Sequence, residues 1–137
     1  MTSAAVSLDV PRSADQVWRL IGGFGSLPDW LPYITESRLT EGGRVRTLTN
    51  DEGQVIVERL EAFDEAARSY RYSIARAPFP VRQYRSTLRV VDRGADGARV
   101  EWSGEFVPDG VTDAEATALF ETIYRDGLRA LAETIAA

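Results

Sequence analysis

Residues 112–135, which read TDAEATALFETIYRDGLRALAETI, decide the fold. Thr112 and Glu115 have the spacing of a capping box, and Asp113 adds negative charge at the positive end of a helix. Apolar residues then recur at steps of three and four, namely Ala116, Leu119, Phe120, Ile123, Tyr124, Gly127, Leu131 and Ile135. This pattern predicts one amphipathic helix of about 24 residues with a single apolar stripe.

The chain before this helix alternates between short apolar strands and tight turns. We expect strands near residues 3–10, 34–40, 44–50, 54–63, 68–76, 82–93 and 98–107. Most of the turns between them carry Gly, Asn or Asp, and strands joined so tightly pair antiparallel.

Two short helices are expected after the first strand. Ser13 and Gln16 form a second capping box, and Gly22 ends the helix that begins there. Ser26 is expected to cap another short helix before Pro32. The sequence therefore predicts an α+β fold, in which the long C-terminal helix covers the apolar face of a curved antiparallel sheet of about seven strands.

The composition of the chain excludes several classes of function. The chain has 137 residues, which suits one domain spanning residues 1–137, and its net charge of -5 disfavours nucleic acid as a partner. It has no cysteine and no histidine, which excludes thiolate ligands, disulfides and histidine bases. Since no carboxylate cluster has ligand spacing, we expect no metal and no cofactor. With no membrane-length apolar run and no signal-peptide pattern, we expect a cytoplasmic protein.

Hairpin register predicts which side chains share a face. Centring one hairpin on Glu52 places Arg46 opposite Glu58, on the same face as the apolar pair Leu48 and Ile56. Centring the next hairpin on Ala66 pairs further even-numbered residues: Glu58 with Ile74, Leu60 with Tyr72, and Ala62 with Tyr70. In the last two strands the even-numbered residues are predicted to lie on the same face, namely Tyr84, Leu88, Val90, Val100, Trp102 and Phe106. We interpret this even-numbered face as the concave, inward one.

Arg46 and Glu58 are therefore two charged residues on an apolar wall, and three interpretations stay open. They form a buried cross-strand ion pair that fixes register. Alternatively, Arg46 anchors a ligand carboxylate, phenolate or enolate while Glu58 holds the ligand or moves a proton, which makes both candidate catalytic residues. In the third interpretation the register differs and both side chains face solvent.

Aromatic residues supply the candidate ligand-binding set. They are Trp30, Tyr33, Tyr72, Tyr84, Trp102, Phe106, Phe120 and Tyr124. Each one taken alone is also typical of plain core packing, and Trp30 with Trp18 is expected to pack the short helices on the sheet. Several tyrosine hydroxyls around one apolar volume nevertheless favour a pocket, because pockets use a few well-placed polar groups.

Short stretches distributed along the chain resemble a known family. They are Val17–Gly22, Leu27–Pro32, Gly43–Leu48, Val57–Leu60, Tyr70–Tyr72, Tyr84–Leu88, Val100–Trp102 and Phe106–Pro108. Together they resemble the START/SRPBCC (helix-grip) superfamily, and within it the polyketide cyclase/dehydrase-like and MxaD-like small bacterial proteins. The resemblance implies a ligand cavity between sheet and helix. Leu31 stands where many relatives carry a histidine, which argues against a histidine-dependent cyclase mechanism.

Three functions follow as hypotheses. The first is binding of a small hydrophobic or aromatic ligand, in a protein of the cyclase, dehydratase or isomerase type. The second is a carrier or sensor of lipid-like molecules without chemistry, and the third is a protein-interaction module similar to chaperone cofactors. Whether the protein is an enzyme stays open. We expect a monomer or a homodimer, since the exposed edge of a half-open sheet supports pairing.

Overall fold

A computed structural model of the chain describes residues 1–136. Its seven strands form one antiparallel sheet in the order β1-β7-β6-β5-β4-β3-β2. The strands are β1 (Thr2–Val10), β2 (Ile34–Thr40), β3 (Val45–Asn50), β4 (Val55–Asp64), β5 (Ser69–Arg76), β6 (Val81–Asp92) and β7 (Ala98–Pro108). The helices are α1 (Ala14–Ile21) and α2 (Asp113–Ala136), and single 3-10 turns occupy Leu27–Asp29, Glu41–Gly43 and Gly94–Asp96.

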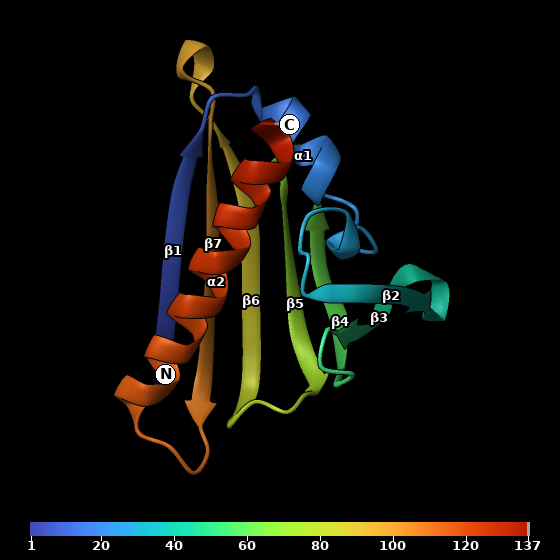
Figure 1. The fold of residues 1–137 in the computed structure, drawn as a ribbon, viewed down its shortest axis with the longest axis vertical. Helices are drawn as coiled ribbons and strands as arrows, with labels where there is room; N and C mark the ends of the chain where they lie inside the picture. Colours follow the sequence, from blue (N-terminus) through green and yellow to red (C-terminus); the bar gives the residue numbers. More distant parts are fainter. Residues whose placement is uncertain (137) are drawn as a thin grey trace.

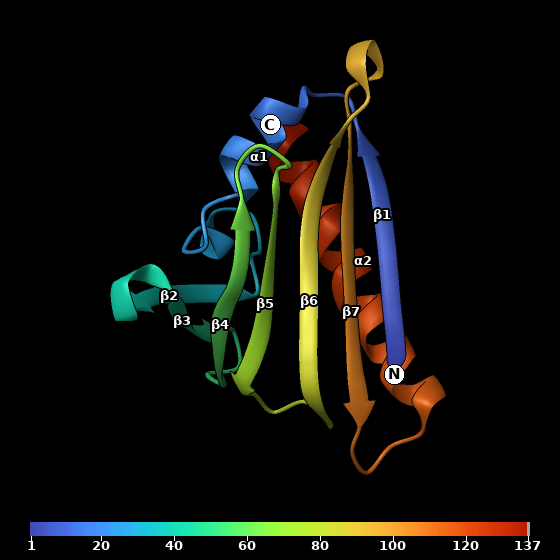
Figure 2. The ribbon, with the colours of Figure 1, turned by 180° about the vertical axis from the view of Figure 1, so that it is seen from behind.

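The long helix lies on one face of the sheet only. Figure 1 shows α2 crossing in front of β1, β7 and β6, with α1 near its C-terminal end. Seen from behind, the strands face the viewer without a covering helix (Figure 2). This arrangement confirms the α+β helix-grip prediction, and it places the core between the sheet and α2. No helix within residues 1–136 is long and apolar enough to cross a membrane.

Local signals account for both α-helices but not for the turn between them. The Glu115 backbone N–H donates to Thr112 Oγ1 over 3.1 Å, and the Thr112 N–H donates to Glu115 Oε1 over 2.9 Å. The predicted capping box at Ser13 is also present. The second short helix is present as a single 3-10 turn with Ser26 at its N-cap position, but the Ser26 hydroxyl donates to the Gly23 carbonyl and does not cap the turn.

The predicted register is correct around the charged pair and wrong further along β4. Arg46 pairs with Glu58 and Leu60 with Tyr72, as expected. Beyond Leu60 a β-bulge inserts one extra residue, so that Phe63 and not Ala62 lies opposite Tyr70. The parity of β4 therefore changes, and the Phe63 ring packs 5.7 Å from that of Trp18.

Parity in the last two strands was predicted correctly. The inward residues of β6 and β7 are all buried: Tyr84, Leu88, Val90, Val100, Trp102 and Phe106. A bulge between Arg82 and Arg85, with Gln83 at a φ of 54°, leaves the faces of the later residues unchanged.

Two glycines let α2 lie close to β7. A Cβ atom at Gly127 of α2 would come within 2.6 Å of Trp102 Cζ3, and one at Gly104 of β7 would collide with the Tyr124 hydroxyl. The Trp102 and Tyr124 rings stack between these points, with centroids 4.8 Å apart. Glycine at both positions therefore sets the separation between helix and sheet.

Gly127→Ala is expected to lower the free energy of unfolding by about 1–3 kcal/mol, because the added methyl overpacks against Trp102. At an exposed helical site alanine is more stable than glycine by about 1 kcal/mol. The reverse exchange at an exposed position of the same helix, Ala118→Gly, is the matched control and is expected to destabilise the protein by about that amount. Urea denaturation is expected to show that both variants are less stable than the wild type, although the two exchanges run in opposite directions. A stabilised Gly127→Ala variant would show that α2 does not approach β7 this closely.

Candidate functional site

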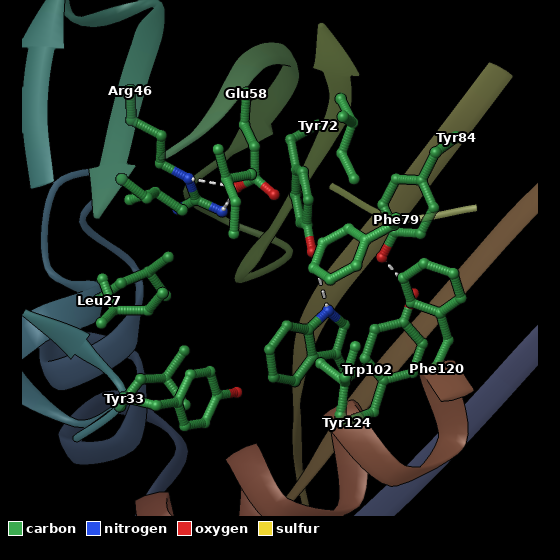
Figure 3. Close-up of a pocket in the computed structure, with 16 residues that line it drawn as sticks. Leu27, Tyr33, Arg46, Glu58, Tyr72, Phe79, Tyr84, Trp102, Phe120 and Tyr124 are labelled. Carbon is green, nitrogen blue, oxygen red and sulfur yellow. Dashed lines mark hydrogen bonds and ion pairs between the residues drawn. The ribbon is translucent and has the colours of Figure 1, made fainter. Parts of the chain in front are cut away.

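A cavity of about 60 Å³ lies between the concave face of the sheet and α2. Figure 3 shows that its polar side chains come from opposite walls, with Arg46 and Glu58 on strands and Tyr33 on the segment before β2. The other predicted residues that line it are Tyr72, Tyr84, Trp102, Phe120 and Tyr124.

Two predicted ligand-binding residues do not line the cavity. Trp30 and Phe106 are buried in the core, where Trp30 packs on Trp102 and Phe106 stacks on Tyr84. In this structure both rings lie behind the cavity wall, and their contact with a ligand stays a prediction.

Sequence reasoning also missed several lining residues. They include Leu27, Leu31, Ile34, Ile74, Phe79 and Ile123. Phe79 lies in the connection between β5 and β6 and reaches the Phe120 ring, 5.5 Å away between centroids. Its contact with the helix arises from the path of a loop, for which the strand pattern carries no signal.

Arg46 and Glu58 form a buried ion pair across β3 and β4. Arg46 Nε donates to Glu58 Oε1 over 2.8 Å, and Arg46 Nη2 lies 2.7 Å from the same oxygen. Only 1% of Arg46 and 6% of Glu58 is exposed. The interpretation in which both face solvent is therefore wrong.

The rest of the Arg46 guanidinium is also held by the protein. Nη1 donates to the Phe24 carbonyl over 3.1 Å and to the Tyr70 hydroxyl over 3.3 Å. Aromatic rings cover the faces of the group, with Phe24 at 4.1 Å and Tyr72 at 4.8 Å from Cζ to the ring centroids. Every guanidinium nitrogen thus has a partner inside the fold.

Glu58 differs from Arg46 because only one of its oxygens is engaged. Both contacts from Arg46 go to Oε1, and no hydrogen bond from residues 1–136 reaches Oε2. Figure 3 shows this second oxygen turned away from Arg46, toward the side of Tyr72. Burial raises the pKa of Glu58 above its ordinary value of 4.5, while the charge of Arg46 and its hydrogen bond oppose that rise.

Hydrogen-bonded hydroxyls form the wall near α2. Trp102 Nε1 donates to the Tyr72 hydroxyl and to Ser86 Oγ, each over 3.1 Å, and Ser86 donates in turn to the Ser103 carbonyl. The hydroxyls of Tyr84 and Tyr124 contact each other. Ser86 has the inward parity of β6, but it was not among the predicted ligand-binding residues.

Burial keeps these phenols protonated. It raises the pKa of Tyr72 and Tyr84 above the usual 10.0, and that of Tyr124 to about 12. It also raises the pKa of Tyr33, whose hydroxyl is buried without a hydrogen-bond partner among the described residues. Near neutral pH the cavity therefore presents neutral hydroxyls and one ion pair.

Within residues 1–136, no group of three or more Asp or Glu side chains is placed to hold a metal ion. The chemistry that the cavity offers on its own comes from the Glu58 carboxylate, the tyrosine hydroxyls and a largely apolar surface.

A curved sheet, a long C-terminal helix and a cavity between them define a START-like protein of the helix-grip class. The chain belongs to the family described as polyketide cyclase / dehydrase and lipid transport, which matches residues 1–136.

Solved structures agree with this assignment. The protein XoxI from Bacillus cereus is 54% identical, with a TM-score of 0.94 over 97% of this chain and 94% of that one. An uncharacterized protein from Bacillus thuringiensis is 51% identical, with a TM-score of 0.96 over 98% of this chain and 99% of that one. The Zhui aromatase/cyclase from Streptomyces sp. R1128 shares the fold at 20% identity, with a TM-score of 0.76 over 97% and 90%. No protein of curated function matches the chain.

The ion pair should show strong coupling in a double-mutant cycle. Glu58→Leu leaves the Arg46 charge buried and unpaired, and is expected to cost about 3–5 kcal/mol of stability. Adding Arg46→Met removes that charge, so the double variant should return close to the wild-type free energy of unfolding.

Urea denaturation of the wild type, both single variants and the double variant measures this coupling. Arg59→Met with Glu41→Leu, an exposed pair, is the matched control and should show little coupling. Additive losses at Arg46 and Glu58 would mean that the two charges do not depend on each other.

Proposed function

We propose that this protein binds a small hydrophobic or aromatic molecule in the cavity between the sheet and α2. The observation that carries this proposal is the Glu58 carboxylate, which is almost fully buried and keeps one oxygen free of protein partners. A buried charge is costly unless its hydrogen-bonding capacity is used, so a free oxygen at a cavity wall favours a ligand that donates to it.

The composition of the wall supports the same proposal. Ligand pockets combine mostly apolar surface with a few polar groups that set orientation, and here leucine, isoleucine and aromatic side chains surround Glu58 and the tyrosines. The family description names polyketides and lipids, whose apolar bodies fit such a wall.

In this proposal Arg46 is a positioning residue and Glu58 contacts the ligand. Arg46 holds Glu58 Oε1 in place and uses its remaining nitrogens on Phe24 and Tyr70. The geometry thus favours contact at Glu58 over direct anchoring by the guanidinium, which was the alternative open from the sequence.

The free volume limits the size of the ligand. About 60 Å³ is well below the roughly 300–1,000 Å³ of pockets for drug-sized ligands. A single-ring molecule therefore requires the lining side chains to move apart, and a fused multi-ring polyketide requires the cavity to widen much further.

Filling the cavity should abolish ligand binding without unfolding the protein. A ligand at a hundred times its dissociation constant adds about 2.7 kcal/mol of stability, so a thermal-shift screen of phenols, short fatty acids and small polyketide fragments reveals it. Ile74→Phe places extra volume at the cavity wall, and the stabilisation should disappear. Ala75→Phe is the matched control, because Ala75 is exposed, and should keep it. Equal stabilisation of both variants would place the ligand elsewhere.

The free Glu58 oxygen also favours a second candidate function, proton transfer in a cyclase, dehydratase or isomerase reaction. Glu58 Oε2 would take a proton from the bound substrate and return it to another atom of the same molecule. Such acid–base catalysis contributes about 10²–10⁴-fold, and the raised pKa of Glu58 moves the carboxylate toward the range where it is useful.

If Glu58 acts as the base, turnover of a bound substrate should rise with pH, because the carboxylate must be ionised. The midpoint of the rise should lie above the ordinary value of 4.5. Glu58→Gln should remove the turnover together with this pH dependence, while changing the dissociation constant far less. Full turnover in Glu58→Gln, or a pH profile of kcat unchanged by it, would show that Glu58 is not the base. Absence of turnover of any bound ligand by the wild type would leave only the carrier function.

A further inference from the structure

The cavity holds two polar atoms without hydrogen-bond partners among residues 1–136. They are Glu58 Oε2 on β4 and the Tyr33 hydroxyl on the opposite wall. The Tyr33 hydroxyl lies beside α2, since a Cβ atom at Gly127 would be 3.2 Å from it. The Glu58 oxygen is thus a hydrogen-bond acceptor that belongs to a carboxylate. The Tyr33 hydroxyl is a neutral group that either donates or accepts a hydrogen bond.

Most of the positive charge in the same cavity is taken up by the protein. Arg46 is the only cationic side chain on the described wall, and four of its five N–H groups are held by Glu58, Phe24 and Tyr70. Phe24 and Tyr72 cover the faces of the guanidinium, so an anion could contact only the remaining Nη2 N–H group, beside the Glu58 carboxylate, unless it displaced Glu58 or Phe24. Displacing Glu58 would leave a second negative charge unpaired in the same apolar space.

We propose that the cavity selects neutral molecules with a hydroxyl donor on a small apolar body, such as single-ring phenols, and rejects carboxylates of the same shape. This inference rests on the proposed binding function and narrows its ligand class. The ligand hydroxyl donates to Glu58 Oε2, and Tyr33 offers a hydrogen bond to a second neutral group. A ligand carboxylate would lose its hydration and meet a carboxylate without a free cation.

Three ligands of one shape test the charge selection. They are p-cresol with a hydroxyl, p-xylene with a methyl group and p-toluate with a carboxylate. At pH 7 the phenol is neutral and the benzoate ionised. NMR titration of the wild-type protein is expected to show p-cresol binding about tenfold more tightly than p-xylene, and about a hundredfold more tightly than p-toluate.

Two variants assign the selection to the charge of Glu58. Glu58→Gln removes the negative charge and loosens the hold on Arg46, so the preference for p-cresol over p-toluate should fall at least tenfold. Tyr33→Phe deletes one neutral hydroxyl of similar burial and should leave that preference in place. Loss of the preference in Tyr33→Phe, with its retention in Glu58→Gln, would contradict the assignment.

The outcomes separate the inference from the function on which it rests. If p-toluate binds the wild type as tightly as p-cresol, the selection rule fails while the binding function stands. If none of the three compounds binds in the millimolar range and the broader screen finds no ligand either, the proposed binding function fails and the selection rule fails with it.

Discussion

The buried ion pair between Arg46 and Glu58 is the constraint on which the rest of the site depends. It joins β3 to β4, and through Phe24 and Tyr70 it also ties the loop after α1 and strand β5 to the same guanidinium. Desolvating two charges is costly, and their hydrogen bonds and aromatic neighbours offset that cost. A slip of one residue in either strand would turn its charged side chain to the other face of the sheet and break the pair, so the pair also opposes alternative registers.

Much of the fold follows from local patterns. The capping box at Thr112 and the three- and four-residue steps after it predict α2, and strand alternation with hairpin arithmetic predicts that Arg46 faces Glu58. The arithmetic fails beyond Leu60, because a bulge adds a residue without a distinctive turn signal. The short helix after Ser26 is present as a 3-10 turn, but its side-chain cap is not, since the Ser26 hydroxyl donates to the Gly23 carbonyl and does not accept from a helix N–H group.

The candidate site is less accessible to sequence reasoning, because it depends on loops and on the depth of packing. Parity places Tyr72, Tyr84 and Trp102 inward, but it cannot separate a ring at the cavity wall from one behind it, as with Phe106. Nor does it show that the Phe24 carbonyl occupies Arg46 and so leaves Glu58 as the group open to a ligand. The roles of these residues toward a ligand stay proposals.

The central claim is that Glu58 is a buried carboxylate with one oxygen open to the cavity. A carbon-13 NMR titration of the Glu58 side-chain carboxyl, assigned with Glu58→Gln, tests it most directly. The account predicts a titration midpoint above 4.5 and a change in the Glu58 signal when p-cresol is added. A midpoint at or below 4.5, with no response to p-cresol, would mean that pairing with Arg46 outweighs burial and that Oε2 is closed to a ligand, and would contradict the account.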